Sequence, residues 1–452
     1  MKIGERIETR IEKPVYGGDF LARHNGQVVF APLVMPHEFV AMEILEAKRN
    51  YARGEAKTLI EPSPDRLRPE CVHFGQCGGC HYQHAGSEQQ RHFKLAILRD
   101  ALSRAGLDVP QPILLLDGHP WAYRNRIRLA VDSTIANSGS RLGYRARFSH
   151  RIVPIVQCPI ASPVLVPLAL RIAEWLKQQG HLDCIAEIEL ITNPTQDAVQ
   201  VTLIPSDANG AGVAATRRET QVAAQPVLRL ASLLDTMLEE IGSPLSGITL
   251  ATGDNDPASA QIAQVGSGTL LYSVAETQYE IPAGAFFQVN RWLLEPFRAL
   301  VTQHEKGSLA WDLFAGVGFF ARALEMQFDR VIAVEGANTS FRSLQNALKN
   351  PSSRAVEAST LSFLHQNRRE REKRPDFLVL DPPRSGLGAE TCALLAAIHP
   401  ARMTYVSCDP VTLARDLKLL TAERFQIESI HLVDLFPQTY HIETVVKLVR
   451  KS

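Results

Sequence analysis

The residues in the last third of the chain that could do chemistry follow apolar, strand-like runs. Phe314 ends one run and leads into a turn with two glycines, and Glu335 ends the next run 19 residues after Gly316. Asp381, followed by Pro-Pro-Arg, and Cys408, followed by Asp-Pro, come at the ends of two later runs. A glycine turn with an acid about 20 residues further on is typical of sites for a dinucleotide or for S-adenosylmethionine. This spacing does not distinguish the two ligands.

The thiol of Cys408 narrows the chemistry. Hydride transfer has no use for a nucleophilic thiol beside the cofactor, whereas methylation of C5 of a pyrimidine does. C5 of uracil is a poor nucleophile until a thiolate adds to C6, and a base must later remove the C5 proton. Glu443, in the C-terminal stretch HIETVV, is our candidate for that base. The pattern therefore favours methylation of a pyrimidine with Cys408 as the nucleophile and S-adenosylmethionine as the methyl donor.

A second group of thiols lies near the N-terminus, in the stretch CVHFGQCGGC. Cys71, Cys77 and Cys80 have five and then two residues between them. The first residues, MKIGERIETR, lack the apolar stretch of a signal peptide, so we expect a cytoplasmic protein whose thiols stay reduced. Clustered thiols in that setting indicate metal ligands. A 4Fe-4S cluster held with a distant fourth cysteine fits this spacing, and structural zinc is the other interpretation.

The elements that position the candidate site are expected to form a parallel sheet. The strand-like runs LAWDLF, RVIAVE, DFLVLD and RMTYVSC alternate with helical patterns, which predicts a sheet covered by helices on both faces. Because ligands of such sheets bind at the carboxyl ends of the strands, the candidate residues should meet at one edge. The last two runs, IESIHLVDLF and IETVVKLVR, fit a terminal antiparallel pair.

The first two thirds of the chain divide into a strand-rich start and a mixed region. Short strands with tight turns over the first 60 or so residues predict a small barrel of the oligonucleotide-binding kind. Residues 87–107 predict a helix with Ser87 as its N-cap and Gly106 as its stop. We expect the following division: a barrel over 1–67, a central metal-cluster and RNA-binding domain over 68–86 and 109–285, and a methyltransferase domain over 87–108 and 286–452.

Composition and charge set further limits. The chain has 452 residues, of which 45% are hydrophobic and 21% charged, so it can bury several cores. No apolar run reaches the roughly 18 residues that a membrane helix needs. The 48 basic and 48 acidic residues balance, which gives no overall signal for nucleic acid. A local signal is a stretch of arginines interleaved with aromatics, a pattern that can hold phosphates and stack bases but also fits a solvated strand face. These arginines are Arg124, Arg126, Arg128, Arg141, Arg145, Arg147 and Arg151, and the aromatics are Trp121, Tyr123, Tyr144 and Phe148.

Four stretches together resemble the successive motifs of the RNA (uracil-5-)methyltransferases. They are DLFAGVGFF, DPPRSG, SCDPVTLARDL and FPQTYHIETVVKL. The stretch CVHFGQCGGC resembles the iron–sulfur members of that family, the bacterial 23S rRNA enzymes. The resemblance covers nearly the whole chain. It implies an α/β, Rossmann-like methyltransferase domain, an N-terminal TRAM-like β-barrel and an α+β central domain that carries an iron–sulfur cluster.

The resemblance also assigns roles to residues. It implies that Cys408 is the nucleophile and Glu443 the base, and that the S-adenosylmethionine and uracil pocket includes Gln288, Phe314, Glu335 and Asp381. It implies Cys158 as the fourth ligand, with Cys71, Cys77 and Cys80, of a 4Fe-4S cluster. Arg124, Asn125 and Arg126 match a basic stretch that approaches RNA. The partner implied is 23S rRNA, and nothing suggests more than a monomer.

One position departs from the family pattern, and two other functions remain open. Where the family usually has Asn after the glycine turn, this chain has Phe319, which cannot hydrogen-bond to the cofactor. An RNA-binding assembly protein with a degenerate pocket is therefore one alternative. The other is an amino-methyltransferase that uses Asp381 and the prolines after it and needs no thiol. Transfer RNA is the alternative substrate.

Overall fold

The computed structural model describes residues 1–132, 142–206, 225–251, 261–368 and 374–451. The chain forms two compact units: Met1–Pro120 with Asp381–Ser452, and Trp121–Leu380. Within the described residues, no helix is long and apolar enough to cross a membrane. Of the candidate RNA-binding arginines, Arg141 lies outside the described residues.

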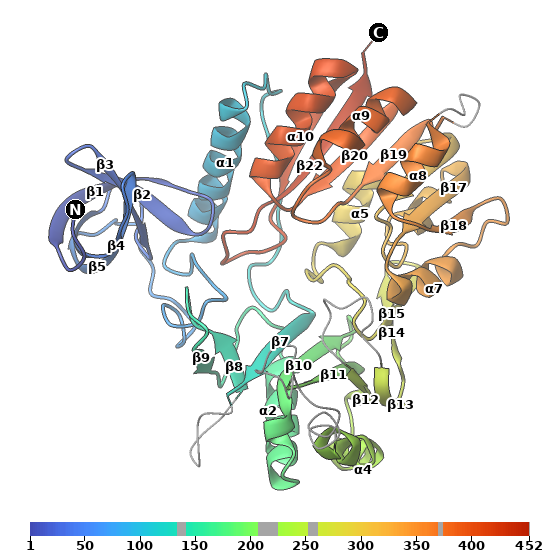
Figure 1. Cartoon of the computed structure of the whole chain (residues 1–452), viewed down its shortest axis with the longest axis horizontal. Coiled ribbons are helices and arrows are strands. Elements are labelled where there is room, and N and C mark those ends of the chain that lie inside the picture. Colours follow the sequence, from blue (N-terminus) through green and yellow to red (C-terminus); the bar gives the residue numbers. More distant parts are fainter. Residues whose placement is uncertain (133–141, 207–224, 252–260, 369–373, 452) are drawn as a thin grey trace, which may run out of the picture. The chain divides into compact units, whose positions relative to one another are not determined.

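The first unit begins with a closed five-stranded barrel, in the order β1-β2-β3-β5-β4 (Figure 1). Its strands are β1 (Arg6–Pro14), β2 (Asp19–His24), β3 (Gln27–Pro32), β4 (Phe39–Ala47) and β5 (Tyr51–Glu61). β1 alternates exposed and buried residues, as a strand with one face on a core must. Its buried face includes Ile7 and Ile11, which pack with Phe20 and Val40 in the barrel core. The barrel predicted from short strands and tight turns is confirmed.

The first unit continues with α1 (Ser87–Arg104), which packs against β1 and α10. Gly106 has a φ of 73° and ends the helix as predicted. The predicted N-cap is wrong, because Ser87 is the first helical residue and Gly86 occupies the cap position without a side-chain hydrogen bond. The buried face of α1 includes two polar residues, Gln90 and Lys94, besides the expected apolar ones.

The C-terminal part of the first unit carries a four-strand run in the order β20-β22-β21-β6. Its strands are β6 (Leu114–Leu116), β20 (Arg402–Ser407), β21 (Phe425–Val433) and β22 (Glu443–Arg450), and its helices are α9 (Gly388–Ile398) and α10 (Pro410–Glu423). β21 and β22 pair antiparallel, as predicted for the last two runs. Cys408 follows β20 directly, and Glu443 begins β22.

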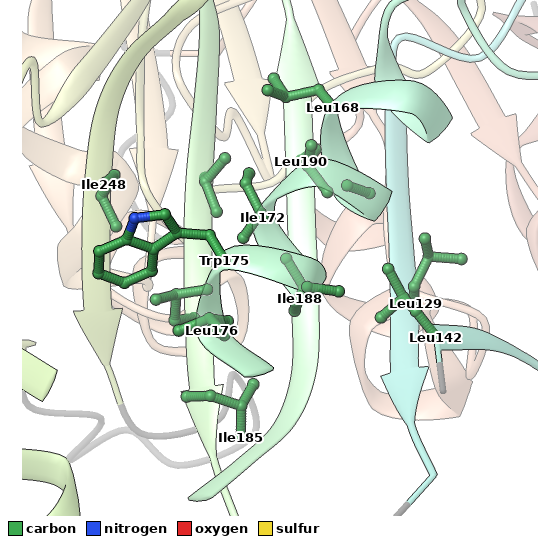
Figure 2. Packing of buried hydrophobic residues seen from close by; sticks show 14 of the residues in the cluster. Leu129, Leu142, Leu168, Ile172, Trp175, Leu176, Ile185, Ile188, Leu190 and Ile248 are labelled. Atoms are coloured by element: carbon green, nitrogen blue, oxygen red, sulfur yellow. The ribbon is translucent and has the colours of Figure 1, made fainter. Parts of the chain in front are cut away.

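The second unit begins with a seven-stranded sheet in the order β13-β12-β11-β10-β7-β8-β9. Its strands are β7 (Arg126–Val131), β8 (Leu142–Arg145), β9 (Ile152–Pro154), β10 (Ile185–Thr192), β11 (Val199–Pro205), β12 (Leu245–Ala251) and β13 (Gln261–Gly266). Helices α2 (Leu165–Gln178) and α4 (Leu234–Ile241) and the short 3-10 turn η1 (Leu182–Cys184) accompany it. Figure 2 shows Ile172 and Trp175 of α2 packed with Leu190 of β10 and Ile248 of β12 in the apolar core.

The rest of the second unit is a parallel run of strands in the order β18-β17-β16-β19. Its strands are β16 (Gly307–Leu313), β17 (Phe328–Glu335), β18 (Arg354–Glu357) and β19 (Phe377–Leu380), preceded by the hairpin β14 (Thr269–Val274) and β15 (Thr277–Pro282). Its helices are α5 (Leu294–Thr302), α6 (Ala321–Leu324), α7 (Asn338–Ala347) and α8 (Thr360–Asn367). The parallel pairing predicted for the runs LAWDLF, RVIAVE and DFLVLD is confirmed.

Candidate active site

Cys408 lies in the first unit, between the end of β20 and the start of α10. Asp409 is the N-cap of α10, and its Oδ1 accepts hydrogen bonds from the backbone N–H groups of Val411 (2.9 Å) and Thr412 (3.0 Å). Pro410 at the first helical turn fits this start. The Cys408 side chain is half-buried. The cap therefore fixes the backbone on which the thiol is mounted.

Charged side chains of the same unit surround the Cys408 thiol. Burial, together with the negative charges of Glu443 and Asp381, raises the pKa of Cys408 to about 12, while Arg384 opposes that rise. Burial also raises the pKa of Glu443, again with Asp381 adding to the shift and Arg384 opposing it. The pKa of Asp381 is raised by burial as well. The structure thus brings the sequence-predicted Cys408, Glu443 and Asp381 within electrostatic reach of one another.

The loop that carries Arg384 is organised by a buried carboxylate that sequence reasoning did not single out. Asp416 of α10 is fully buried, and its Oδ2 accepts from Leu387 N (2.7 Å) and from the Tyr405 hydroxyl (2.9 Å). A Cβ at Gly386, which has a φ of 71°, would lie 2.4 Å from Asp416 Oδ2. The glycine of the PPRSG stretch is therefore required by this close approach.

The loop before Glu443 is held by the polar residues on the buried face of α1. Lys94 Nζ donates to Asp434 Oδ1 (2.7 Å) and to the Phe436 carbonyl (2.8 Å). Gln90 and Gln438 exchange two hydrogen bonds of 2.8 Å each, one between their side chains and one from the Gln438 backbone N–H. A lysine and a glutamine four residues apart on an apolar helix face were the sequence signal for these contacts.

The glycine turn lies in the second unit, directly after β16. Phe314 has a φ of 68°, a left-handed conformation that costs energy for a residue with a side chain. The Glu335 carboxylate accepts from Gly316 N (2.7 Å) and from Ala337 N (2.6 Å). A Cβ at Gly316 would meet no described atom within 4 Å, so the turn borders open space.

These features fit S-adenosylmethionine. A carboxylate has about four acceptor sites, so Glu335 can hold the turn and still accept ribose hydroxyls. Gln288 is also in the second unit and is buried, with its backbone carbonyl accepting from Asn125 Nδ2 (3.0 Å). Glu335 therefore shapes the turn as well as being available to a ligand, a role that the sequence prediction did not include.

Phe319 belongs to an aromatic cluster inside the second unit. Its ring lies 5.6 Å from those of Tyr279 and Phe287, and its carbonyl accepts from the Tyr279 hydroxyl (3.1 Å). The side chain is only 6% exposed. Phe319 thus stabilises the segment after the glycine turn by packing. Its lack of a polar group is therefore explained by its place in the core, which weakens the reason for suspecting a degenerate pocket.

Part of the basic stretch expected to face RNA is structural. Asn125 is 1% exposed and donates to the Tyr272 hydroxyl (3.1 Å) as well as to the Gln288 carbonyl. Arg126 donates to the Ala285 carbonyl (2.7 Å), and burial lowers its pKa. The prediction that this pair approaches RNA is not supported, since both side chains hold the 285–288 segment. Their spacing in a strand gave no sign of that role.

The arginines further along the stretch divide between ion pairs and exposed positions. Arg128 and Arg145 both pair with Glu187, Arg145 at 3.2 Å. Phe148 is 72% exposed, and Arg151 is exposed beside it in the β8–β9 turn. Tyr123 by contrast is fully buried. Only the β8–β9 part of the described stretch therefore combines exposed arginine with an exposed aromatic ring.

Three of the four predicted metal ligands, Cys71, Cys77 and Cys80, lie in the first unit, and Cys158 lies in the second. Among the residues that the structure describes, no group of three or more His, Cys, Asp or Glu side chains is placed to hold a metal ion. The structure therefore does not support the iron–sulfur site. Cys392 is buried in α9, and Cys184 is half-buried.

Comparison with known proteins adds to this geometry. Residues 258–451 match the family described as tRNA (Uracil-5-)-methyltransferase, and residues 1–57 match the TRAM domain. A tRNA (uracil-54, C5)-methyltransferase of Pyrococcus abyssi, solved with S-adenosyl-L-homocysteine, covers 98% of this chain with all of its own, at 22% identity and a TM-score of 0.72. That likeness shows an S-adenosylmethionine methyltransferase fold.

Relatives in sequence extend over nearly the whole chain. A protein of Alkalilimnicola ehrlichii named 23S rRNA (uracil(1939)-C(5))-methyltransferase RlmD is 31% identical over 99% of this chain and 97% of its own length. A protein of the same name from Shewanella denitrificans is 30% identical over 98% of this chain and 96% of its own. With these full-length matches and the motif residues placed as described, the chain belongs to the RNA uracil-5-methyltransferase family and carries an N-terminal TRAM domain.

Proposed function

We propose that this protein methylates C5 of a uridine in 23S rRNA, using S-adenosylmethionine and a covalent bond between Cys408 and C6 of the base. The observation that carries the proposal is the arrangement in the first unit. A half-buried thiol stands at the end of β20, within electrostatic reach of the buried Glu443 carboxyl, the half-buried Asp381 carboxyl and the Arg384 guanidinium. A thiol with a nearby base is what C5 methylation of a uracil requires.

Cys408 starts the reaction. Its Sγ, once deprotonated, forms a bond to C6, and the electron pair of the C5–C6 double bond moves onto C5 and O4 of the ring. S-adenosylmethionine, when bound, supplies the methyl group that C5 takes up. Glu443 then removes the proton from C5, the double bond re-forms and the S–C6 bond breaks. Thiol and enzyme are regenerated once the proton leaves Glu443.

Burial suits Glu443 to this role. A carboxylate whose pKa is raised by burial is a stronger base than one in water. Arg384 lowers the pKa of both the Cys408 thiol and Glu443, because its positive charge stabilises the ionised form of each. Its side chain also lies 3.1 Å from His441 Nδ1, two residues before Glu443. We propose that Asp381 contributes by keeping a proton within this group and by orienting the uracil.

The second unit would hold the methyl donor. We propose that Glu335 accepts hydrogen bonds from ribose hydroxyls while its carboxylate keeps the Gly316 turn in shape, and that Phe314 and Gln288 line the same pocket. The support is the open space at Gly316 and the two backbone hydrogen bonds that Glu335 already accepts.

The choice of ribosomal RNA rests on the relatives. Two of them, about as long as this chain, are named 23S rRNA methyltransferases. The second candidate is transfer RNA, because the matching family description and the solved structure both name tRNA. The TRAM domain is compatible with either substrate.

Methylation assays on defined RNAs test the proposal. The protein is incubated with S-adenosylmethionine and either 23S rRNA or bulk tRNA transcribed without modifications, and 5-methyluridine is measured by mass spectrometry. We expect the nucleoside in 23S rRNA alone, at one position. Methylation of tRNA alone would replace the first candidate by the second, and 5-methyluridine in neither would contradict both.

The iron–sulfur site remains a prediction of the sequence. One local contact is compatible with it, since Gly79 N donates to Cys77 Sγ (3.4 Å). Thiolates that bind clusters receive such bonds. Iron and acid-labile sulfide in anaerobically purified protein, lost in Cys77→Ser, would support the cluster. Zinc in their place, or neither metal, would contradict it.

A further inference from the structure

The turn between β1 and β2 of the barrel contacts the catalytic loop of the same unit. The Tyr16 hydroxyl donates a hydrogen bond to the Cys408 backbone carbonyl (3.3 Å), and the negative charge of Asp409 acts on it as well. These partners are the nucleophile's own carbonyl and the N-cap of α10. The two segments are 392 residues apart in the sequence. A residue of the TRAM domain thus touches the backbone that carries the nucleophile.

The conformation of this turn is fixed by neighbours on three sides. Val15 N donates to Asp19 O (3.0 Å), which closes the turn, and Asp19 is ion-paired with Arg53 in β5. The Tyr16 ring lies edge-on to Tyr440, 5.5 Å between centroids. A Cβ at Gly18 would lie 2.6 Å from His81 Cδ2, so only glycine permits this approach. The hydroxyl is therefore held in place and does not depend on a flexible side chain.

We propose that Tyr16 is a positioning residue for catalysis: its hydroxyl orients the Cys408–Asp409 peptide and so directs the Cys408 sulfur towards C6 of the uracil. This inference rests on the proposed function and adds a role for the barrel beyond binding RNA. The peptide after Cys408 sets the direction of its Cα–Cβ bond, and α10 begins two residues after Cys408, at Pro410. Loss of the hydroxyl leaves the Cys408 carbonyl without this donor and frees that peptide.

The geometry favours an effect on rate. Small misplacement of a reacting atom slows a bond-forming step steeply, because the attack needs a near-attack geometry. The Asp409 carboxylate caps α10 through Val411 and Thr412, so the carboxylate that starts the helix also carries the charge that acts on Tyr16. Tyr16 itself is half-buried, and its ring is packed by Tyr440. A loss of RNA affinity is therefore not the expected result of removing only the hydroxyl.

The test compares Tyr16→Phe with the wild type and with Tyr51→Phe, a tyrosine of β5 in the same barrel. The readouts are kcat and KM for 23S rRNA and the rate of covalent adduct formation with RNA that contains 5-fluorouridine. Removing the hydrogen bond to the Cys408 carbonyl should lower kcat and the adduct rate by about tenfold, with KM unchanged within about twofold. Tyr51→Phe should match the wild type. Tyr16→Phe should be equally folded by circular dichroism.

A double-mutant comparison separates positioning from general damage. Asp409→Asn keeps a good N-cap but removes the negative charge that acts on the Tyr16 hydroxyl. If Tyr16 acts through Asp409, adding Tyr16→Phe to Asp409→Asn should slow the reaction by less than about half of its effect alone. Wild-type rates in Tyr16→Phe, a rise in KM alone, or fully additive effects would overturn the inference. Absence of an adduct in the wild type would instead contradict the proposed function.

Discussion

The two regions that carry the candidate site residues are built on opposite principles. In the second unit, the Gly316 turn is fully supported: Glu335 accepts two backbone hydrogen bonds, and Phe319 packs in an aromatic cluster. In the first unit, Cys408 and Glu443 lie where burial and neighbouring negative charge oppose their ionised forms. The polar groups at the Gly316 turn have hydrogen-bond partners, whereas Cys408 and Glu443 lie where their ionised forms are unfavourable.

This contrast matches the roles that we propose for the two regions, ligand binding in the second unit and chemistry in the first. A site for a ligand is best when its groups are already in place, since ordering them on binding costs affinity. A nucleophile and a base need pKa values displaced from those in water, which a protein obtains at some cost in stability. The strained groups of the first unit are accordingly surrounded by buried supports, Asp416 under the Arg384 loop and Lys94 under the loop before Glu443.

The largest expected effect comes from removing the nucleophile. Cys408→Ser should reduce methylation of RNA by about 10⁴-fold or more, because an alcohol cannot replace the thiolate in adding to C6. Radioactive methyl transfer measures it. The matched control is Cys184→Ser, a half-buried cysteine of the second unit, which should keep its activity. Activity within tenfold of the wild type in Cys408→Ser would place the chemistry elsewhere, as in an amino-methyltransferase.

Removal of the base should stop the reaction at a later step, after the methyl group has been transferred to C5. Glu443→Gln should lower turnover by about 10²–10⁴-fold and should leave RNA covalently attached, because the C5 proton is not removed and the thiol cannot leave. Denaturing gels detect the complex. Glu428→Gln, an exposed carboxylate on β21, is the control.

The same variant tests whether Glu443 is strained. An acid whose folded pKa is raised contributes instability above its unfolded pKa, so Glu443 should destabilise the fold at pH 8 and less so at pH 5. Glu443→Gln should therefore raise Tm at pH 8 by about 2 °C, with a smaller rise at pH 5. A lower Tm of Glu443→Gln than of the wild type at pH 8 would contradict the claim that ionised Glu443 destabilises the fold.

The pH dependence of the adduct rate should follow the ionisation of the Cys408 thiol. Because burial and the neighbouring carboxyl groups raise the pKa of Cys408 to about 12, the thiolate fraction grows with pH throughout the accessible range. The adduct rate should rise by about tenfold per pH unit from 7 to 9. Arg384→Gln, which removes the opposing cation, should lower the rate at each pH. A rate that levels off below pH 8 would show that bound RNA lowers the thiol pKa.

The smallest effect is expected in the supported region. Glu335→Gln weakens two charge-assisted hydrogen bonds at the glycine turn, so affinity for S-adenosylmethionine should fall by about tenfold. Calorimetry measures the affinity, and kcat at saturation should change by less than about threefold if the turn only binds. Glu276→Gln, in the exposed β14–β15 turn, serves as the control. A large loss of kcat in Glu335→Gln would contradict the division into a binding region and a catalytic region.

The sequence predicted the parts of this arrangement that depend on local pattern. The runs ending at Phe314, Glu335 and Asp381 are strands or strand ends, and so is the run before Cys408. Strand periodicity and the rule that ligands bind at carboxyl ends were sufficient for that. The pairing of β20 with β22, which brings Glu443 beside the end of the strand before Cys408, was not predicted.

The supports of the site could not be predicted in the same way. Tyr16, Gln90 and Lys94 act through contacts 340 or more residues distant, which no local pattern encodes. Asn125 reads as part of a basic surface, yet it is buried. The prediction of Ser87 as N-cap was wrong because the helix begins at Ser87 itself and not at the residue after it. Polar residues on an apolar face indicated a buried partner but not which one.

The most direct test of the account is a covalent trap at Cys408. 23S rRNA transcribed with 5-fluorouridine is incubated with the wild-type protein and S-adenosylmethionine, and the attached peptide is identified by mass spectrometry after protease and nuclease digestion. Fluorine at C5 cannot leave as the proton does, so we predict a stable methylated adduct on Cys408. An adduct on another residue, or none with RNA that the protein otherwise methylates, would contradict the central claim.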